Sequence, residues 1–248
     1  PPVALPGGIG YRFGRSGGAL TLSRVVCTEA GDVPLGPSLV ARRRGLADGP
    51  AVAAGARDLE IEALLGATRD GGAVPRGLVS RLLHLLAGAE NVTFDGRTVE
   101  VSARPIEPVV VFVDDRADGF VLRAAPHPAL EDSAGTAAVA GGTLRPLAEV
   151  RLSAPERDRL ARGLGVTAGE VGELVSRTLP DLARRVPVEI RTTRLPGTVR
   201  LEPRAAVRID ACEGGFAVRA AILYGRPAAA RIEDGRLVPL GAVLPVRN

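Results

Sequence analysis

The closing stretch of the chain, residues 186–248, reads VPVEIRTTRLPGTVRLEP from Val186 to Pro203 and AAVRIDACEGGFAVRAAILYGRPAAARIEDGRLVPLGAVLPVRN from Ala205 to Asn248. Apolar and polar residues alternate along it, which is typical of half-buried strands. Turn-forming residues interrupt the alternation, as in Glu213-Gly214-Gly215. The stretch therefore predicts a run of antiparallel hairpins, with strands near 186–192, 198–202, 205–212, 216–224, 228–233 and 236–240.

Two helix-start signals stand just before this stretch. Ser153-Ala154-Pro155-Glu156 and Thr167-Ala168-Gly169-Glu170 both have the form of a capping box, in which the hydroxyl and the carboxylate satisfy free backbone N–H groups. The second helix is expected to kink or break at Pro180, because proline lacks the N–H that a helix needs. We therefore predict helical structure near 153–185.

The first 150 residues combine strand signals with a firm helix signal near 75–88, where leucine and valine recur at helical spacing. A shorter helix is predicted at 57–66. Asp95-Gly96 lies between two alternating runs and predicts a two-residue hairpin turn. The fold class is therefore α+β, mainly antiparallel hairpins with a few helices. We expect two domains: 1–150, β-rich with one or two helices, and 151–248, a helical pair followed by an antiparallel meander.

Composition narrows the class of protein. The chain has 248 residues, of which 46% are hydrophobic, so it can bury a real core. No apolar run approaches the roughly 18 residues that span a bilayer, so no membrane partner is expected. The start, PPVALPGG, has neither an initiating Met nor a leader pattern and resembles the edge of a fragment. Two widely spaced cysteines, Cys27 and Cys212, fit a reducing cytoplasm.

Several catalytic chemistries have no counterpart in the residues. All 32 basic residues are Arg, so neither a phosphate-binding loop with its Lys nor a Schiff-base Lys is present. The cysteines form no C-x-x-C pair, and the two His are isolated, so no metal ligand set is predicted. Asp114-Asp115 ends a strand before a turn, where such acids are ordinary caps, although an enzyme that uses them is a third interpretation. No catalytic, cofactor-binding or metal-binding residue is assigned.

Arginine is concentrated in two places. Between Arg12 and Arg44 there are six Arg against two acidic residues, and between Arg177 and Arg208 there are eight against three. Arginine binds phosphate bidentately, which favours salt-dependent contact with a nucleic-acid backbone. Aromatic residues are only 3% of the chain and Trp is absent, which disfavours a base-stacking platform. The candidate nucleic-acid-binding residues are Arg42, Arg43, Arg44, Arg184, Arg185, Arg191 and Arg194.

Three phrases of the closing stretch resemble a known family. They are TLPDLARRVPVEIRTTRLPG at 178–197, AILYGRPAAARIEDGRLVPL at 221–240 and GAVLPVRN at 241–248. Together they resemble the helicase-associated N-terminal region of bacterial Swi/Snf-type DEAD/DEAH-box helicase-like ATPases. The resemblance covers about seventy residues. Residues 1–150 have only a general likeness to the family and no matching phrase. It implies that ATP and Mg²⁺ bind in motor lobes elsewhere in the same polypeptide, and no catalytic residue transfers to this chain.

The resulting hypothesis is a non-catalytic accessory region of a bacterial, cytoplasmic ATP-dependent helicase or translocase. Its partners would be the helicase motor lobes in the same polypeptide and duplex DNA, and it would either contact the DNA or restrain the motor. The alternative is a structural or protein-interaction module without nucleic-acid contact. The scarcity of polar constellations favours that alternative.

Overall fold

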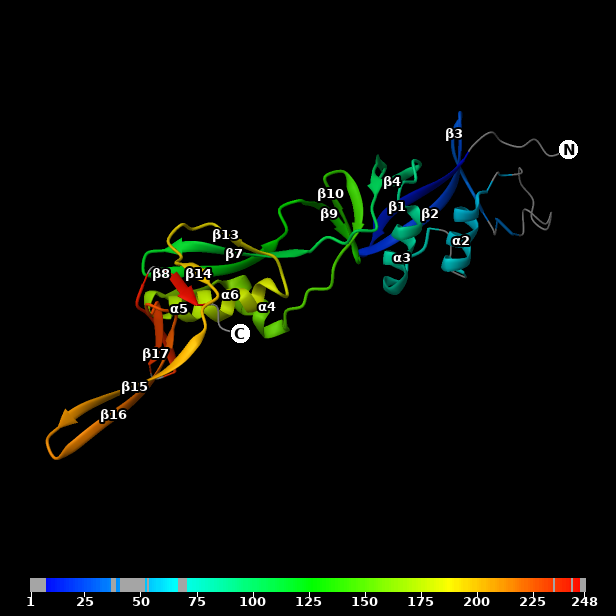
Figure 1. Cartoon of the computed structure of the whole chain (residues 1–248). Coiled ribbons are helices and arrows are strands. Elements are labelled where there is room, and N and C mark those ends of the chain that lie inside the picture. Colours follow the sequence, from blue (N-terminus) through cyan, green and yellow to red (C-terminus); the bar gives the residue numbers. More distant parts are fainter. Residues whose placement is uncertain are drawn as a thin grey trace. The chain divides into compact units, whose positions relative to one another are not determined.

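The computed structural model describes residues 8–36, 39–40, 52, 54–66, 71–233, 235–241 and 243–245 (Figure 1). The chain has an α+β fold in which most strand pairs are antiparallel, as predicted. It divides into two compact units. Unit 1 comprises residues 1–108 and 127–149, and unit 2 comprises residues 109–126 and 150–248. The predicted Arg42–Arg44 run lies outside the described residues.

Unit 1 contains two small sheets and two described α-helices. One sheet has the order β3-β2-β1-β4-β5, and the other β6-β11-β10-β9. The predicted turn at Asp95-Gly96 joins β4 to β5, with a positive φ at both residues. The elements are β1 (Ile9–Ser16), β2 (Ala19–Thr28), β3 (Gly31–Pro34), α2 (Ala56–Leu65), α3 (Arg76–Leu86), β4 (Val92–Phe94), β5 (Arg97–Thr98), β6 (Glu100–Val101), β9 (Leu130–Ala134), β10 (Ala137–Ala140) and β11 (Thr143–Pro146).

The core of unit 1 forms where α2 and α3 pack against the strands. Leu82, Leu83 and Leu86 of α3 are fully buried in it, as the helical spacing of that segment predicts. The buried phenol of Tyr11 donates a 2.6 Å hydrogen bond to Asp58 of α2. Burial, helped by this bond, raises the pKa of Tyr11. The phenol therefore stays neutral and ties α2 to β1.

Unit 2 is built on the hairpin β7 (Val109–Arg116) and β8 (Gly119–Pro126). Strand β12 (Leu164–Thr167) pairs antiparallel with β8, and β13 (Val188–Ile190) pairs parallel with β7. Helix α4 (Ala154–Arg162) and a longer helical segment pack on this sheet. That segment runs through η1 (Ala168–Glu170), α5 (Val171–Glu173), η2 (Leu174–Thr178) and α6 (Leu179–Ala183).

The division into units differs from the predicted boundary near residue 150 in one respect. The β7–β8 hairpin precedes that boundary in sequence but belongs to unit 2. Both of its outer partners, β12 and β13, come from residues beyond 150. Its side chains Val111, Val113 and Leu122 are buried in the same cluster as the helices of unit 2. Long-range strand pairing therefore sets the boundary.

The helices of unit 2 begin at the predicted caps. Ser153 Oγ accepts a hydrogen bond from the Glu156 backbone N–H, and the Glu156 carboxylate accepts one from Ser153 N at 2.8 Å. Thr167 and Glu170 form the equivalent box. The expected break near Pro180 takes the form of a π-helical turn, η2, just before it, in which the Leu179 N–H bonds to the Leu174 carbonyl. Pro180 then lies in the first turn of α6, where the missing N–H is tolerated.

Between residues 203 and 239 the closing stretch forms the predicted antiparallel meander, β15-β16-β17-β18. Its strands are β15 (Pro203–Cys212), β16 (Gly215–Tyr224), β17 (Ala230–Glu233) and β18 (Arg236–Pro239). The prediction of antiparallel hairpins is wrong for the rest of the stretch, because β13 pairs parallel with β7 and the short strands β14 (Gly197–Val199) and β19 (Val243–Pro245) pair parallel with each other in a separate sheet. The β15–β16 pair is ten residues long, whereas β17 pairs only with the last three residues of β16. Figure 1 shows most of the β15–β16 hairpin projecting away from the rest of unit 2.

Candidate nucleic-acid interface

The positive charge of the chain belongs to unit 2. That unit has 19 Arg against 14 Asp and Glu, a surplus of five, whereas unit 1 has 13 Arg against 14 acidic residues. Phosphate-binding surfaces are expected where basic residues exceed acidic ones on one body. Unit 2 is therefore the part of the chain where a nucleic-acid interface is expected.

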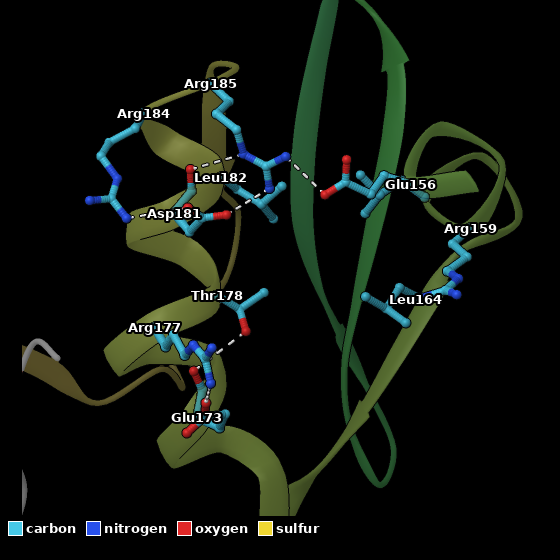
Figure 2. A pocket seen from close by; sticks show the side chains of 11 residues that line it. Glu156, Arg159, Leu164, Glu173, Arg177, Thr178, Asp181, Leu182, Arg184 and Arg185 are labelled. Carbon is cyan, nitrogen blue, oxygen red and sulfur yellow. Dashed lines mark hydrogen bonds and ion pairs between the residues drawn. The ribbon is translucent and has the colours of Figure 1, made fainter. Parts of the chain in front are cut away.

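A groove of about 650 Å³ lies between α4, β12 and the helical segment that ends in α6. Figure 2 shows Glu156, Arg159 and Leu164 on one wall. Arg177, Asp181, Arg184 and Arg185 belong to the opposite wall, from which Arg185 reaches toward Glu156 and Arg184 extends away from it. The buried side chains of Leu160 and Leu182 contribute apolar lining. The groove thus has an apolar base and a charged rim.

Arg185 links the two walls of the groove through hydrogen bonds. Its guanidinium donates to Glu156 of α4 at 2.8 Å and to Asp181 of α6 at 2.7 Å. The hydrogen bonds from Ser153, with the charge of Arg185, lower the pKa of Glu156 to about 2. Glu156 therefore remains ionised and serves both the helix cap and the bridge. Arg185 is partly buried and committed to two partners, so its role is architectural.

Three other arginines lie exposed around the same groove. Arg177 pairs with Glu173 at 3.2 Å and Arg184 pairs with Asp181 at 3.2 Å, both with side chains more than 70% exposed. Arg159 has no hydrogen-bond or ion-pair partner among the described residues. Exposed pairs within one helix contribute only about 0.3–0.5 kcal/mol. A phosphate can therefore compete with the carboxylates for these three guanidinium groups.

The structure brings only two of the candidate arginines to this groove, Arg184 and Arg185. Arg191 instead lies over the Phe112 ring, 3.5 Å from its centroid, and bonds to Glu189. Arg194 lies over Phe120 and donates to the carbonyl of Arg116. These two arginines pack on phenylalanine rings of the β7–β8 hairpin. Stacking of this kind needs the tertiary position of the rings and has no local signal in the sequence.

Arg159 and Arg177 are not among the candidate arginines that the sequence predicts. A weak signal for Arg159 exists, because it lies three residues after Glu156 in a helix whose start is well marked. What brings Arg159 opposite Arg177 is the packing of α4 beside the π-helical segment, which the spacing of residues in the chain does not predict.

Asp115 of the Asp114-Asp115 pair makes contacts of a structural kind. Asp115 accepts a 2.7 Å hydrogen bond from the Thr192 hydroxyl and lies 3.5 Å from Arg194. These contacts tie the end of β7 to the loop after β13. Within the described ranges, no group of three or more His, Cys, Asp and Glu side chains is arranged to hold a metal ion. Both cysteines are free, and Cys27 Sγ accepts a hydrogen bond from Arg12.

Comparison with known proteins finds no match: no family model, no curated protein and no solved structure is similar to this chain. Among the described residues, no helix is long and apolar enough to cross a membrane.

Proposed function

We propose that the chain is a non-catalytic accessory region of a Swi/Snf-type ATP-dependent helicase or translocase, and that unit 2 contacts the phosphate backbone of duplex DNA. The observation that supports this most directly is the exposure of Arg159, Arg177 and Arg184 around one groove. The resemblance of the closing stretch to the helicase-associated region supplies the proposed context. In that context the motor lobes in the same polypeptide bind ATP and Mg²⁺ in a bacterial cytoplasm.

The proposed contact is electrostatic and blind to sequence. Three exposed guanidinium groups can each bind a phosphate oxygen, whereas the groove presents no aromatic side chain for stacking among its lining residues. Backbone contacts position a protein on the duplex without reading bases. An accessory region of this kind would hold a motor on DNA and leave the direction and energy of movement to the motor.

The test is a salt titration of binding to duplex DNA, from about 50 mM to about 300 mM NaCl, for the chain and two variants. The first variant replaces Arg159, Arg177 and Arg184 by Ala. Each lost phosphate contact should reduce the slope of log affinity against log salt by about one, so we expect a loss of about three. The matched control replaces Arg81, Arg97 and Arg104, three exposed arginines of unit 1.

Both variants lose the same charge, so only the position of the arginines differs. Equal slopes for the two variants would show that the groove has no special role. Absence of binding to the unmodified chain at low salt would exclude the DNA contact altogether.

A second candidate function, a protein-interaction module without nucleic-acid contact, is favoured by one specific observation. The β15–β16 hairpin exposes large apolar residues that nothing in the described part of the chain covers. This candidate predicts that the chain ignores duplex DNA but binds isolated helicase motor lobes. A titration of the chain with such lobes, free of DNA, discriminates between the two.

A further inference from the structure

The projecting hairpin has two chemically different faces. In the antiparallel register, Ala205 pairs with Ile222, Val207 with Ala220, Ile209 with Val218 and Ala211 with Phe216. Paired residues lie on the same side of a ribbon, so these eight side chains form one face without a single charged or polar group. We call the projecting β15–β16 hairpin the arm, and this side of it the apolar face of the arm. The opposite face carries Arg204, Arg208 and Arg219 together with Asp210.

The apolar face is strongly exposed. Val207 and Ile209 are each 64% exposed, Val218 66% and Phe216 76%. Surface valine or phenylalanine is ordinary when isolated, but a contiguous set on a projecting element marks an interaction site. An isolated two-stranded ribbon is also only marginally stable in water. A covering partner therefore removes apolar area from water and supports the ribbon at once.

We propose that this partner is a second copy of the same chain, with the apolar faces of two arms packed against each other. The apolar face alternates large and small residues, because Phe216, Ile222 and Val207 each lie opposite an alanine. Large side chains of one copy can occupy the hollows over the alanines of the other, as in the packing of two sheets about 10 Å apart. The inference is independent of the proposed DNA contact, and it assigns to a second copy the surface that the protein-interaction alternative assigns to the motor lobes.

The available area supports a second copy. The five exposed large residues, Ile222 included, offer on the order of 600 Å² of accessible apolar surface per copy. Two copies therefore bury about 1,200 Å², the lower limit for specific protein–protein interfaces. Complete burial of both apolar faces thus reaches the area that a specific dimer needs.

The charges agree with this arrangement and disfavour DNA on the same face. Packing the apolar faces together directs Arg208 and Arg219 of both copies outward, so no like charges meet in the interface. A nucleic acid on the apolar face would meet no side-chain hydrogen-bond donor for its phosphates. The basic faces of the two arms would remain in contact with solvent.

Sedimentation equilibrium of the 248-residue chain, from about 1 μM to about 200 μM, tests the proposal. We expect the mass to rise with concentration to twice the 25.6 kDa of the chain and to stop there. The double variant Ile209→Glu, Val218→Glu should stay monomeric, because four carboxylates would meet in the interface. The matched control, Arg208→Ser with Arg219→Ser on the opposite face, should still dimerise.

A measurement on the unchanged chain keeps the test valid if the glutamate variant unfolds. Hydrogen exchange of the β15 and β16 amides should slow by at least tenfold between low and high protein concentration. A monomer at every concentration, unlimited assembly, a dimeric glutamate variant or concentration-independent exchange would each overturn the proposal. Slowing of exchange only on addition of duplex DNA would overturn it as well.

Discussion

A methyl group added at Gly119 probes the long-range pairing that defines unit 2. Gly119 begins β8 and lies opposite Thr167 of β12. A Cβ there would lie far inside contact distance of the Val166 carbonyl oxygen and 3.0 Å from the Thr167 Cα. Both neighbours are backbone atoms, so no side-chain rotation can relieve the overlap. The strands β8 and β12 must separate, or the turn at Asp118-Gly119 must distort.

We expect Gly119→Ala to lower the free energy of unfolding of unit 2 by about 3 kcal/mol, the upper part of the range for overpacking. The matched control is Gly235→Ala, at the turn before β18. Gly235 has a φ of +77° and no atom within 4 Å of an added Cβ. Gly235→Ala should lower the free energy of unfolding by about 1 kcal/mol, from backbone strain alone. The difference of about 2 kcal/mol is roughly a thirtyfold change in the unfolding equilibrium.

The assay uses the distribution of tyrosine. The chain has two Tyr and no Trp; Tyr11 is buried in unit 1 and Tyr224 in unit 2. In a Tyr11→Phe background, tyrosine fluorescence during urea unfolding therefore reports unit 2 alone. Equal decreases in the free energy of unfolding for the Gly119 and Gly235 variants would refute the reasoning, because the overlap with β12 would then cost nothing.

Two further predictions concern the helices of unit 2. An added Cβ at Gly172 in α5 would lie 2.7 Å from the Leu237 carbonyl oxygen of β18, so Gly172→Ala should destabilise unit 2 by about 1–2 kcal/mol. The control Gly169→Ala should not destabilise it, because an added Cβ there meets open space. The same fluorescence assay distinguishes the two variants. The pKa of Glu156 is about 2 against an ordinary value of 4.5, so its contribution to stability is complete above pH 4.5 and declines as the pH falls towards 2. That contribution should not exceed about 1 kcal/mol, because the partly exposed Glu156–Arg185 pair is screened by solvent. Glu156→Gln should therefore reduce the loss of stability at low pH. An unchanged dependence of stability on pH below 4.5 would contradict this.

The local elements of this chain follow from its sequence. Capping boxes at Ser153 and Thr167 mark helix starts because the hydroxyl and the carboxylate that satisfy the backbone lie within four residues of each other. The alternation on both sides of Glu213-Gly214-Gly215 likewise predicts the hairpin that β15 and β16 form. These features depend on short-range geometry, which a sequence displays directly.

The tertiary structure decided which elements are neighbours. The β7–β8 hairpin belongs to unit 2 because it pairs with β12 and β13. These strands lie tens of residues away, and strand pairing over that separation has no local signal in the sequence. Arg159, Arg177 and Arg184 line one groove, whereas Arg191 and Arg194 stack on phenylalanines elsewhere. The alternation of β15 and β16 predicts an apolar face, but only packing determines whether that face is covered. Sequence therefore determined the elements and their charge, and contacts between distant segments determined the groove and the exposed arm.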